Sequence, residues 1–280
     1  MRSLRQVKDL INNLAKDKNI NAQILLKNYM MERILERIAL SDYRDNFILK
    51  GGMLVTSLVG MESRSTVDMD TTMKRKAVSA ETVKAAFDSI LSLDIDDGVT
   101  LEYIKLDEIR DEDENSGFRV TITANFGTAK IPLKIDITVC DAITPEEVVY
   151  PYKLLLEDRV IDVYAYNIES VLAEKMETII SRSITNTRMR DFYDIYILLE
   201  MHKENIDFEV LSNALNATAT KRGTIQLLSE AEMIINEVLS DSVMESHWSR
   251  YHNKYNYASG ISWKTIGDSL SEIWRLLRSY

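Results

Sequence analysis

The segment that most constrains the fold is a pair of glycines at the end of a short apolar run. Residues 47–49 are Phe, Ile and Leu, and Gly51 and Gly52 follow after one lysine. A short unbroken apolar run indicates a buried strand, and paired glycines permit a sharp turn and a close approach of other groups to the backbone. We therefore expect a strand that turns directly into a helix over residues 53–59.

Two aspartates follow the predicted helix at positions i and i+2. Side chains alternate between the two faces of a strand, so Asp68 and Asp70 should point the same way, roughly 6–7 Å apart along the strand, on the face that also carries Thr66. Two carboxylates on one face repel each other unless solvent or a cation lies between them. The pair indicates either a solvated surface strand or a divalent-metal site beside a phosphate held by helix N-terminal amides.

A second strand supplies a third carboxylate. Residues 130–139 alternate between apolar and polar side chains, which places Lys134 and Asp136 on one face and the isoleucines on the other. If this strand lies beside the first, three aspartates can hold two Mg²⁺ ions about 4 Å apart for in-line nucleotidyl transfer. An amphipathic strand with one solvated face is the alternative.

The last candidate group is helical. Lys175 and Arg182 are seven residues apart on one face of a predicted helix, roughly 10 Å from each other along its axis. Asp191 and Asp194 share one side of the next predicted helix. The two cations could bind a triphosphate, since lysine acts as a point charge and arginine as a fork. An ion-pair network between the two helices is the alternative.

Apolar periodicity divides the chain into two parts. Residues 3–45 and the chain after residue 168 show the three- and four-residue spacing of helices, whereas residues 47–163 contain β-branched runs. We therefore predict an α+β fold with one domain over residues 1–165 and a helical domain over residues 166–280. Strands are expected at residues 67–72, 101–106, 119–125 and 133–140, and helices at residues 80–93, 168–182, 190–199, 208–217, 222–239, 241–255 and 261–278.

Composition narrows the class of protein. The formal net charge of −10 argues against non-specific coating of DNA, because phosphate contacts need clustered cations. The single cysteine, Cys140, is expected to be a small buried residue, and a chain with one cysteine suits a reducing compartment. We find no apolar run long enough to span a membrane and no leader pattern, so we expect a cytoplasmic protein without a membrane partner.

The aromatic-rich stretch 248–257 allows two interpretations. Its aromatic rings alternate with cations, as in proteins that stack the bases of single-stranded RNA. However, Trp248, Tyr251 and Tyr255 fall on helical spacing, which favours a buried helix face.

Taken in order, these motifs resemble the AbiEii/AbiGii toxin family of the DNA polymerase β-like nucleotidyltransferase superfamily. The resemblance spans about residues 46–200. It rests on Lys-Gly-Gly at 50–52, Arg-x-x-x-Asp-x-Asp at 64–70, Lys-x-Asp at 134–136, Glu-Lys and a later Arg at 174–182, and Arg-Asp-x-x-Asp at 190–194. It implies a minimal nucleotidyltransferase fold, a mixed sheet flanked by helices, with a C-terminal helical domain.

The resemblance also implies a function. The chain would be the toxin of a toxin–antitoxin pair of the kind that causes abortive infection against phage, and would use Mg²⁺ or Mn²⁺ to transfer a nucleotide from a nucleoside triphosphate. Related MenT-type toxins modify tRNA acceptor ends, so an RNA acceptor, such as a tRNA 3′ end, is expected. Because the antitoxin gene of that family acts separately, we expect neutralisation without a stable complex.

Residue by residue, the resemblance assigns three roles. The nucleotide-binding residues would be Gly51, Gly52, Thr66, Lys134, Lys175 and Arg182. The metal ligands would be Asp68, Asp70 and Asp136, and these three would be catalytic together with Lys175, Asp191 and Asp194. The chain departs from the wider superfamily at Gly52, where a serine is usual, and in the longer gap between Gly52 and Asp68.

Two other functions remain open. A metal-dependent glycosyltransferase also uses an Asp-x-Asp pair, although its nucleotide-sugar domain normally alternates strands with helices, a pattern that this sequence does not show. A nucleotide-binding interaction module without catalysis would keep the same residues for binding alone.

Overall fold

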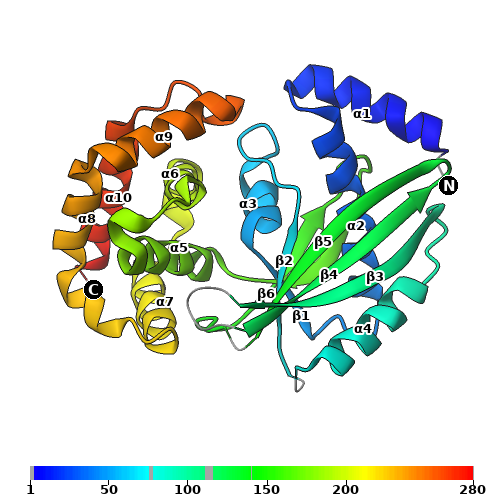
Figure 1. Ribbon diagram of the computed structural model, residues 1–280, viewed down its shortest axis with the longest axis horizontal. Helices are drawn as coiled ribbons and strands as arrows, with labels where there is room; N and C mark the ends of the chain where they lie inside the picture. The colour runs from blue at the N-terminus through cyan, green and yellow to red at the C-terminus, as the bar shows by residue number, and fades with distance from the viewer. Residues whose placement is uncertain (1–2, 76–77, 111–115, 140, 280) are drawn as a thin grey trace. The chain divides into compact units, whose positions relative to one another are not determined.

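The computed structural model describes residues 3–75, 78–110, 116–139 and 141–279 (Figure 1). The chain divides into two compact units: Met1–Cys140 with Val148–Ala165, which we call the sheet unit, and Asp141–Glu147 with Tyr166–Tyr280, which we call the helical unit. The side-chain environment expected for Cys140 lies outside the described residues.

The sheet unit contains a seven-stranded mixed sheet with the strand order β3-β4-β5-β2-β1-β7-β6. Strands β2 and β5 are parallel, as are β1 and β7, and the other neighbours are antiparallel. This confirms the α+β class and the mixed sheet flanked by helices. In chain order the elements are α1 (Leu4–Lys18), α2 (Ala22–Leu40), β1 (Phe47–Lys50), α3 (Gly51–Val59), β2 (Met69–Met73), α4 (Ala80–Ser92), β3 (Val99–Arg110), β4 (Ser116–Phe126), β5 (Ala129–Val139), β6 (Val148–Lys153) and β7 (Val160–Ala165).

The two faces of the sheet differ in character along β4 and β5. Val120 lies opposite Ile135, and Ile122 lies opposite Leu133, and all four side chains are buried. Helix α2 packs on β5 and β7, and α4 packs on β3. The alternate positions of β5 are exposed or half-buried. The sequence alternation therefore produces one dry face covered by helices and one polar face available for a site.

Strands β6 and β7 were not among the predicted strands. β6 is an edge strand of the sheet and contains Pro151 and the exposed Val149, so its sequence lacks the regular alternation of a half-buried strand. Proline is tolerated at a sheet edge because one side of that strand has no ladder to complete. The sequence of β6 therefore gives little indication of a strand, whereas β7 alternates between exposed and buried positions, a pattern that does indicate a strand.

The helical unit contains α5 (Ile168–Arg182), α6 (Met189–His202), α7 (Phe208–Lys221), α8 (Ala231–Ser240), α9 (Ser242–Lys254) and α10 (Trp263–Leu277). The helix predicted over residues 222–239 is shorter than expected, because Ile225–Glu230 forms a 3₁₀ segment before α8 begins. Trp248 is 1% exposed and stacks on Tyr251 with ring centroids 5.4 Å apart. Trp248 and Tyr251 therefore belong to the core of this unit, as the helical spacing indicated, whereas Tyr255 is half-buried and follows the end of α9.

No helix in the part of the chain that the structure describes is long and apolar enough to cross a bilayer.

Charged residues on the buried side of α2 fix this helix in the sheet unit. Arg37 donates to both carboxylate oxygens of Asp97, at 2.7 and 3.0 Å, and to the carbonyl oxygens of Leu93 and Val99. Glu32 accepts the backbone N–H of Leu155 with both oxygens, at 3.0 and 3.1 Å. Burial raises the pKa of Glu32 to about 8, although the Leu155 amide and Arg33 oppose that shift.

The raised pKa of Glu32 predicts a stability change with pH. The folded chain retains a proton that the unfolded chain releases above its ordinary pKa, so this stabilisation is complete at low pH and is lost as the pH rises through about 8. We expect Glu32→Gln to reduce the loss in unfolding free energy between pH 5.5 and 8.5 by on the order of 2–4 kcal/mol.

Scanning calorimetry is the suitable measurement, because all three tryptophans lie in the helical unit and would not report on α2. The exposed Glu102→Gln on β3 is the control, and its pH dependence should match that of the native chain. An unchanged pH dependence in Glu32→Gln would contradict the prediction.

Candidate functional site

Four charged residues form a row across four neighbouring strands of the polar face. Lys50 on β1 lies opposite Asp70 on β2, Asp70 lies opposite Asp136 on β5, and Asp136 lies opposite Arg119 on β4. Directly opposed residues of paired strands project from the same face of a sheet. We call these four residues the charged row; its signs run positive, negative, negative, positive.

Arg119 and Asp136 form a bidentate ion pair. The Nε of Arg119 donates to Oδ1 of Asp136 at 2.7 Å, and Nη2 donates to Oδ2 at 2.6 Å. The Asp136 hydrogen bond raises the pKa of the guanidinium, and the charges of Asp136, Asp68 and Asp70 raise it further. Arg119 therefore lies in the field of all three aspartates, and it holds one of them directly.

Asp70 lies at the start of helix α3. Its Oδ2 accepts the backbone N–H of Gly52 at 3.1 Å, so the carboxylate caps the helix N terminus. Burial raises the pKa of Asp70, and the charges of Asp136 and Asp68 raise it further, while the Gly52 amide and Lys50 lower it. Asp70 is therefore a buried carboxylate in the field of two other carboxylates, and a bound cation would lower that repulsion.

The glycine pair exists because this carboxylate approaches the backbone so closely. Gly51 has a φ of +62°, and a Cβ atom there would lie 2.2 Å from Oδ2 of Asp70. A Cβ atom on Gly52 would lie 2.7 Å from Oγ1 of Thr66. Both glycines belong to α3 itself, which begins two residues earlier than predicted. The absence of side chains at these two positions leaves room for Asp70 and Thr66. The Gly52 amide, which was expected to bind phosphate as a helix N-terminal amide, donates its hydrogen bond to Asp70.

Thr66 and Asp68 lie in the connection before β2, so the expectation that they share a strand with Asp70 was wrong. Strand β2 begins at Met69. The connection is held by Asn28, whose Nδ2 donates to the carbonyl oxygen of Thr66 at 2.8 Å, and the Thr66 hydroxyl donates to the carbonyl oxygen of Asp68 at 3.3 Å. These side-chain hydrogen bonds satisfy the carbonyl oxygens of Thr66 and Asp68, which therefore need no partner in a neighbouring strand before Met69. Asp68 still approaches Asp70 closely enough to raise its pKa.

The donor set fits a hard divalent cation in part. Carboxylate oxygens are the ligands that Mg²⁺ and Mn²⁺ prefer, and Asp68 and Asp70 already repel each other. Asp136 lies next to Asp70 in the charged row, but both of its oxygens accept hydrogen bonds from Arg119. Within the described ranges, no group of three or more histidine, cysteine, aspartate or glutamate side chains has the arrangement of a metal site.

A two-residue hairpin turn sets the position of Arg119, which sequence reasoning missed. Phe126 pairs with Ala129 across Gly127 and Thr128, and this register places Arg119 opposite Asp136. Two alternating strands separated by a glycine-containing two-residue turn predict a β-hairpin, and the length of the turn sets the register of the pair. The sequence therefore contained enough information to place Arg119 opposite Asp136. Lys50 belongs to the Lys-Gly-Gly motif, but the sequence assigned no role to the lysine itself.

Lys134 is exposed on β5, two residues before Asp136. It makes no hydrogen bond or ion pair within the described part of the chain. Its predicted role in nucleotide binding stays a prediction.

The helical motif residues form an ion-pair cluster inside the helical unit. The Nζ of Lys175 on α5 lies 3.1 Å from Oδ1 of Asp191 and 2.6 Å from Oδ2 of Asp194, both on α6. The Asp194 side chain is 0% exposed, and those of Lys175 and Asp191 are only 11% and 12% exposed. Arg182 ends α5, two turns after Lys175. The structure therefore brings Lys175, Asp191 and Asp194 together, in an arrangement more buried than a surface network.

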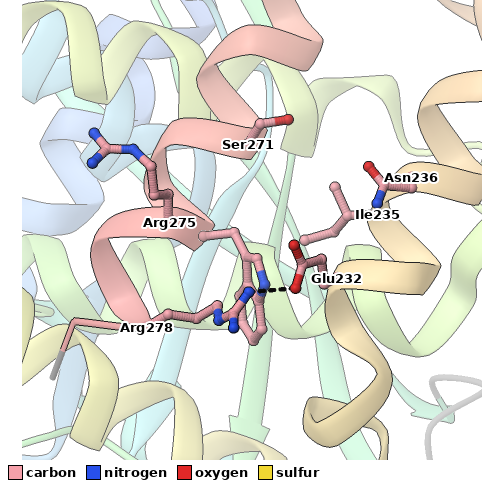
Figure 2. A pocket seen from close by; sticks show the side chains of 7 residues that line it. Glu232, Ile235, Asn236, Ser271, Arg275 and Arg278 are labelled. Carbon is pink, nitrogen blue, oxygen red and sulfur yellow. Dashed lines mark hydrogen bonds and ion pairs between the residues drawn. The ribbon is translucent and has the colours of Figure 1, made fainter.

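A pocket elsewhere in the helical unit contains none of the predicted site residues. Its cavity volume is about 420 Å³, and it lies between α8 and α10, with Asn236 and Trp274 in its lining. Figure 2 shows Arg278 directed toward Glu232, with which it is ion-paired, while Arg275 extends away from this pair. The charged row, not this pocket, gathers the chemistry that the motifs indicated.

The close contact between Gly51 and Asp70 predicts a large cost for a side chain at position 51. Gly51→Ala should lower the unfolding free energy by about 2 kcal/mol or more, because it combines a positive φ with a steric clash. Gly260→Ala is the matched control: its φ is +82° and nothing lies within 4 Å of the added methyl, so it should cost about 1 kcal/mol. Calorimetric unfolding of both variants measures the difference, and equal losses would refute the clash.

Comparison with known structures identifies the class of fold. The structure matches MenT4, a nucleotidyltransferase toxin from Mycobacterium tuberculosis, with a TM-score of 0.60 and 12% identity over 96% of this chain and 98% of that one. It also matches a candidate nucleotidyltransferase from Helicobacter pylori, with a TM-score of 0.51 and 18% identity over 93% and 98% of the two chains. These likenesses show a nucleotidyltransferase fold. No curated protein sequence matches the chain.

The family follows from the sequence match. The model of the family described as nucleotidyl transferase AbiEii toxin, type IV TA system, matches residues 33–268, which include the charged row and the helical cluster. A match over this much of the chain confirms the resemblance drawn from the motifs. The chain therefore belongs to the AbiEii family of nucleotidyltransferase toxins of type IV toxin–antitoxin systems.

Proposed function

We propose that the charged row and Asp68 form the catalytic centre of a metal-dependent nucleotidyltransferase that transfers a nucleoside monophosphate from a nucleoside triphosphate to RNA. A tRNA 3′ end is the acceptor we favour, and arrest of growth is the consequence. The observation that carries the proposal is the convergence of Asp68, Asp70 and Asp136 beside the N terminus of α3.

The residues divide the chemistry between them. Asp68 and Asp70 would hold the divalent ion, Mg²⁺ or Mn²⁺, which when bound supplies positive charge to the reacting phosphate and to the pyrophosphate that leaves. Asp136 accepts the proton of the attacking hydroxyl as the new O–P bond forms and the bond to the bridging oxygen of pyrophosphate breaks. Lys50 and the N terminus of α3 add positive potential at the same edge.

The topology gives no support to a glycosyltransferase. Its nucleotide-sugar domain would alternate strands with helices, whereas β4 and β5 follow each other directly across a two-residue turn. A nucleotide-binding module without catalysis would keep the same cluster, and the variants below separate it from an enzyme.

The setting of the toxin is also part of the proposal. We expect the antitoxin to neutralise this protein without a stable complex, and the pair to act in abortive infection against phage. Nucleoside triphosphates and tRNA place the reaction in the cytoplasm. Purification of the toxin from cells that express both proteins would then yield the toxin alone.

Asp70→Asn tests the catalytic assignment. The asparagine oxygen can still accept the Gly52 amide, so the fold should persist, while loss of the charge should reduce nucleotide transfer by about 100-fold or more. Purified protein is incubated with each α-labelled triphosphate, Mg²⁺ and total cellular RNA, and the labelled RNA is resolved on a gel.

The control for this variant is Asp107→Asn. Asp107 lies opposite Arg119 on the edge strand β3, where it pairs with Lys105 and is 44% exposed, and we expect its loss to leave transfer unchanged. Label transfer and growth arrest that persist in Asp70→Asn would refute the assignment. Retained nucleotide binding with no transfer by the native protein would favour the non-catalytic module.

The helical cluster needs a test that separates stability from function. Lys175→Met alone removes the cation that lies 2.6 Å from the fully buried carboxylate of Asp194 and should destabilise the chain by about 3 kcal/mol or more. Lys175→Met combined with Asp194→Asn removes both charges and should recover most of that stability. We expect this folded double variant to lose nucleotide transfer, as the family motifs predict, and full activity would show that the cluster only holds α5 to α6.

A further inference from the structure

We propose that Arg119 is an internal counter-cation of the carboxylate cluster, and that it exchanges Asp136 for the triphosphate when the metal–nucleotide complex binds. The inference rests on the proposed function and adds to it a residue that none of the family motifs assigned. It gives Arg119 two successive anionic partners at the same position.

Arg119 is committed to a single partner, Asp136, in the structure. Its two bonds to Asp136 are its only hydrogen bonds within the described residues, and it engages both oxygens of that carboxylate. A cation that approached Asp136 in this state would meet the guanidinium charge at close range. Asp136 therefore cannot serve fully as a ligand or a base until Arg119 has moved.

The charge balance of the cluster changes when a divalent ion binds. Three aspartates lie near Lys50 and Arg119, so Arg119 offsets one of the three negative charges and its loss would leave the cluster more negative. A bound divalent ion reverses that balance and leaves excess positive charge. The polyanionic triphosphate then becomes the better partner for the guanidinium fork, which matches phosphate oxygens as well as carboxylate oxygens.

Arg119 is more exposed and makes fewer contacts than Arg37, another arginine of the sheet unit that binds both oxygens of an aspartate. The Arg37 side chain is 2% exposed and is also bound to three backbone carbonyl oxygens, so its pair with Asp97 is a fixed structural contact. The Arg119 side chain is 38% exposed and stands on the polar face, while its neighbour Val120 holds β4 in the core. Arg119 can therefore change partners by side-chain rotation alone.

Binding of Mn²⁺ alone, without nucleotide, tests the exchange. Free Mn²⁺ is measured by electron paramagnetic resonance during titration of the native chain, Arg119→Gln and Arg119→Lys. We expect Arg119→Gln to bind Mn²⁺ about fivefold more tightly, because a competing cation has been removed. Arg119→Lys keeps the charge without the fork and should fall between the other two.

Arg159→Gln is the matched control. Arg159 also binds both oxygens of one carboxylate, that of Glu36, and its side chain is 43% exposed. However, it precedes β7, at the opposite end of that strand from Ala165, and Ala165 is the residue that pairs with Leu49 next to the charged row. Its loss should leave Mn²⁺ affinity unchanged. A purely structural role for Arg119 would weaken Mn²⁺ binding or leave it as it is, and either result in a folded variant would overturn the inference.

Nucleotide kinetics give the second readout. The same Arg119→Gln variant should raise the KM for the triphosphate about tenfold, since the second partner of the guanidinium is lost. Tighter Mn²⁺ binding together with an unchanged KM would overturn the exchange onto triphosphate. Absence of Mn²⁺ binding by the native chain would overturn the proposed metal-dependent reaction itself, whereas native binding that Arg119→Gln does not alter would overturn this inference alone.

Discussion

The site depends on the register of four paired strands. Because β1, β2, β5 and β4 are neighbours, Lys50, Asp70, Asp136 and Arg119 occupy one row of the polar face. A shift of one residue in any of these pairings would turn a charged side chain into the dry face. The buried alternation of isoleucine and valine on β4 and β5 prevents that shift, so the hydrophobic core also fixes the position of the charges.

The second constraint is the close packing of Asp70 on helix α3. Its carboxylate caps the helix N terminus through Gly52, and only glycine at position 51 leaves room for it. The carboxylate thereby becomes both a structural cap and the most crowded acid of the cluster. Burial raises the pKa of Asp70, and the charges of Asp136 and Asp68 raise it further. The carboxylate of Asp70 therefore has two effects: it caps the N terminus of α3, and it adds negative charge that a bound cation would neutralise.

The two arginine–aspartate pairs of the sheet unit show how exposure separates structure from function. The pair between Arg37 and Asp97 is buried and supported by backbone carbonyl oxygens, so breaking it would leave charges in the core. The pair between Arg119 and Asp136 is half-exposed and lies at the polar face. Exposed pairs contribute little net stability, so an exchange of partners there costs the fold little.

The sequence determined the class of fold, most helix boundaries of the helical unit, and the identity of the acidic motif residues. Helix α5 has its predicted bounds because its apolar spacing is regular and Asn167 caps it. The tertiary structure alone decided that Asp68 precedes its strand, that the Gly52 amide is held by Asp70, and that Arg119 holds Asp136. The physical reason is that periodicity reports which face of an element is buried, whereas strand order and side-chain contacts arise only when distant segments pair.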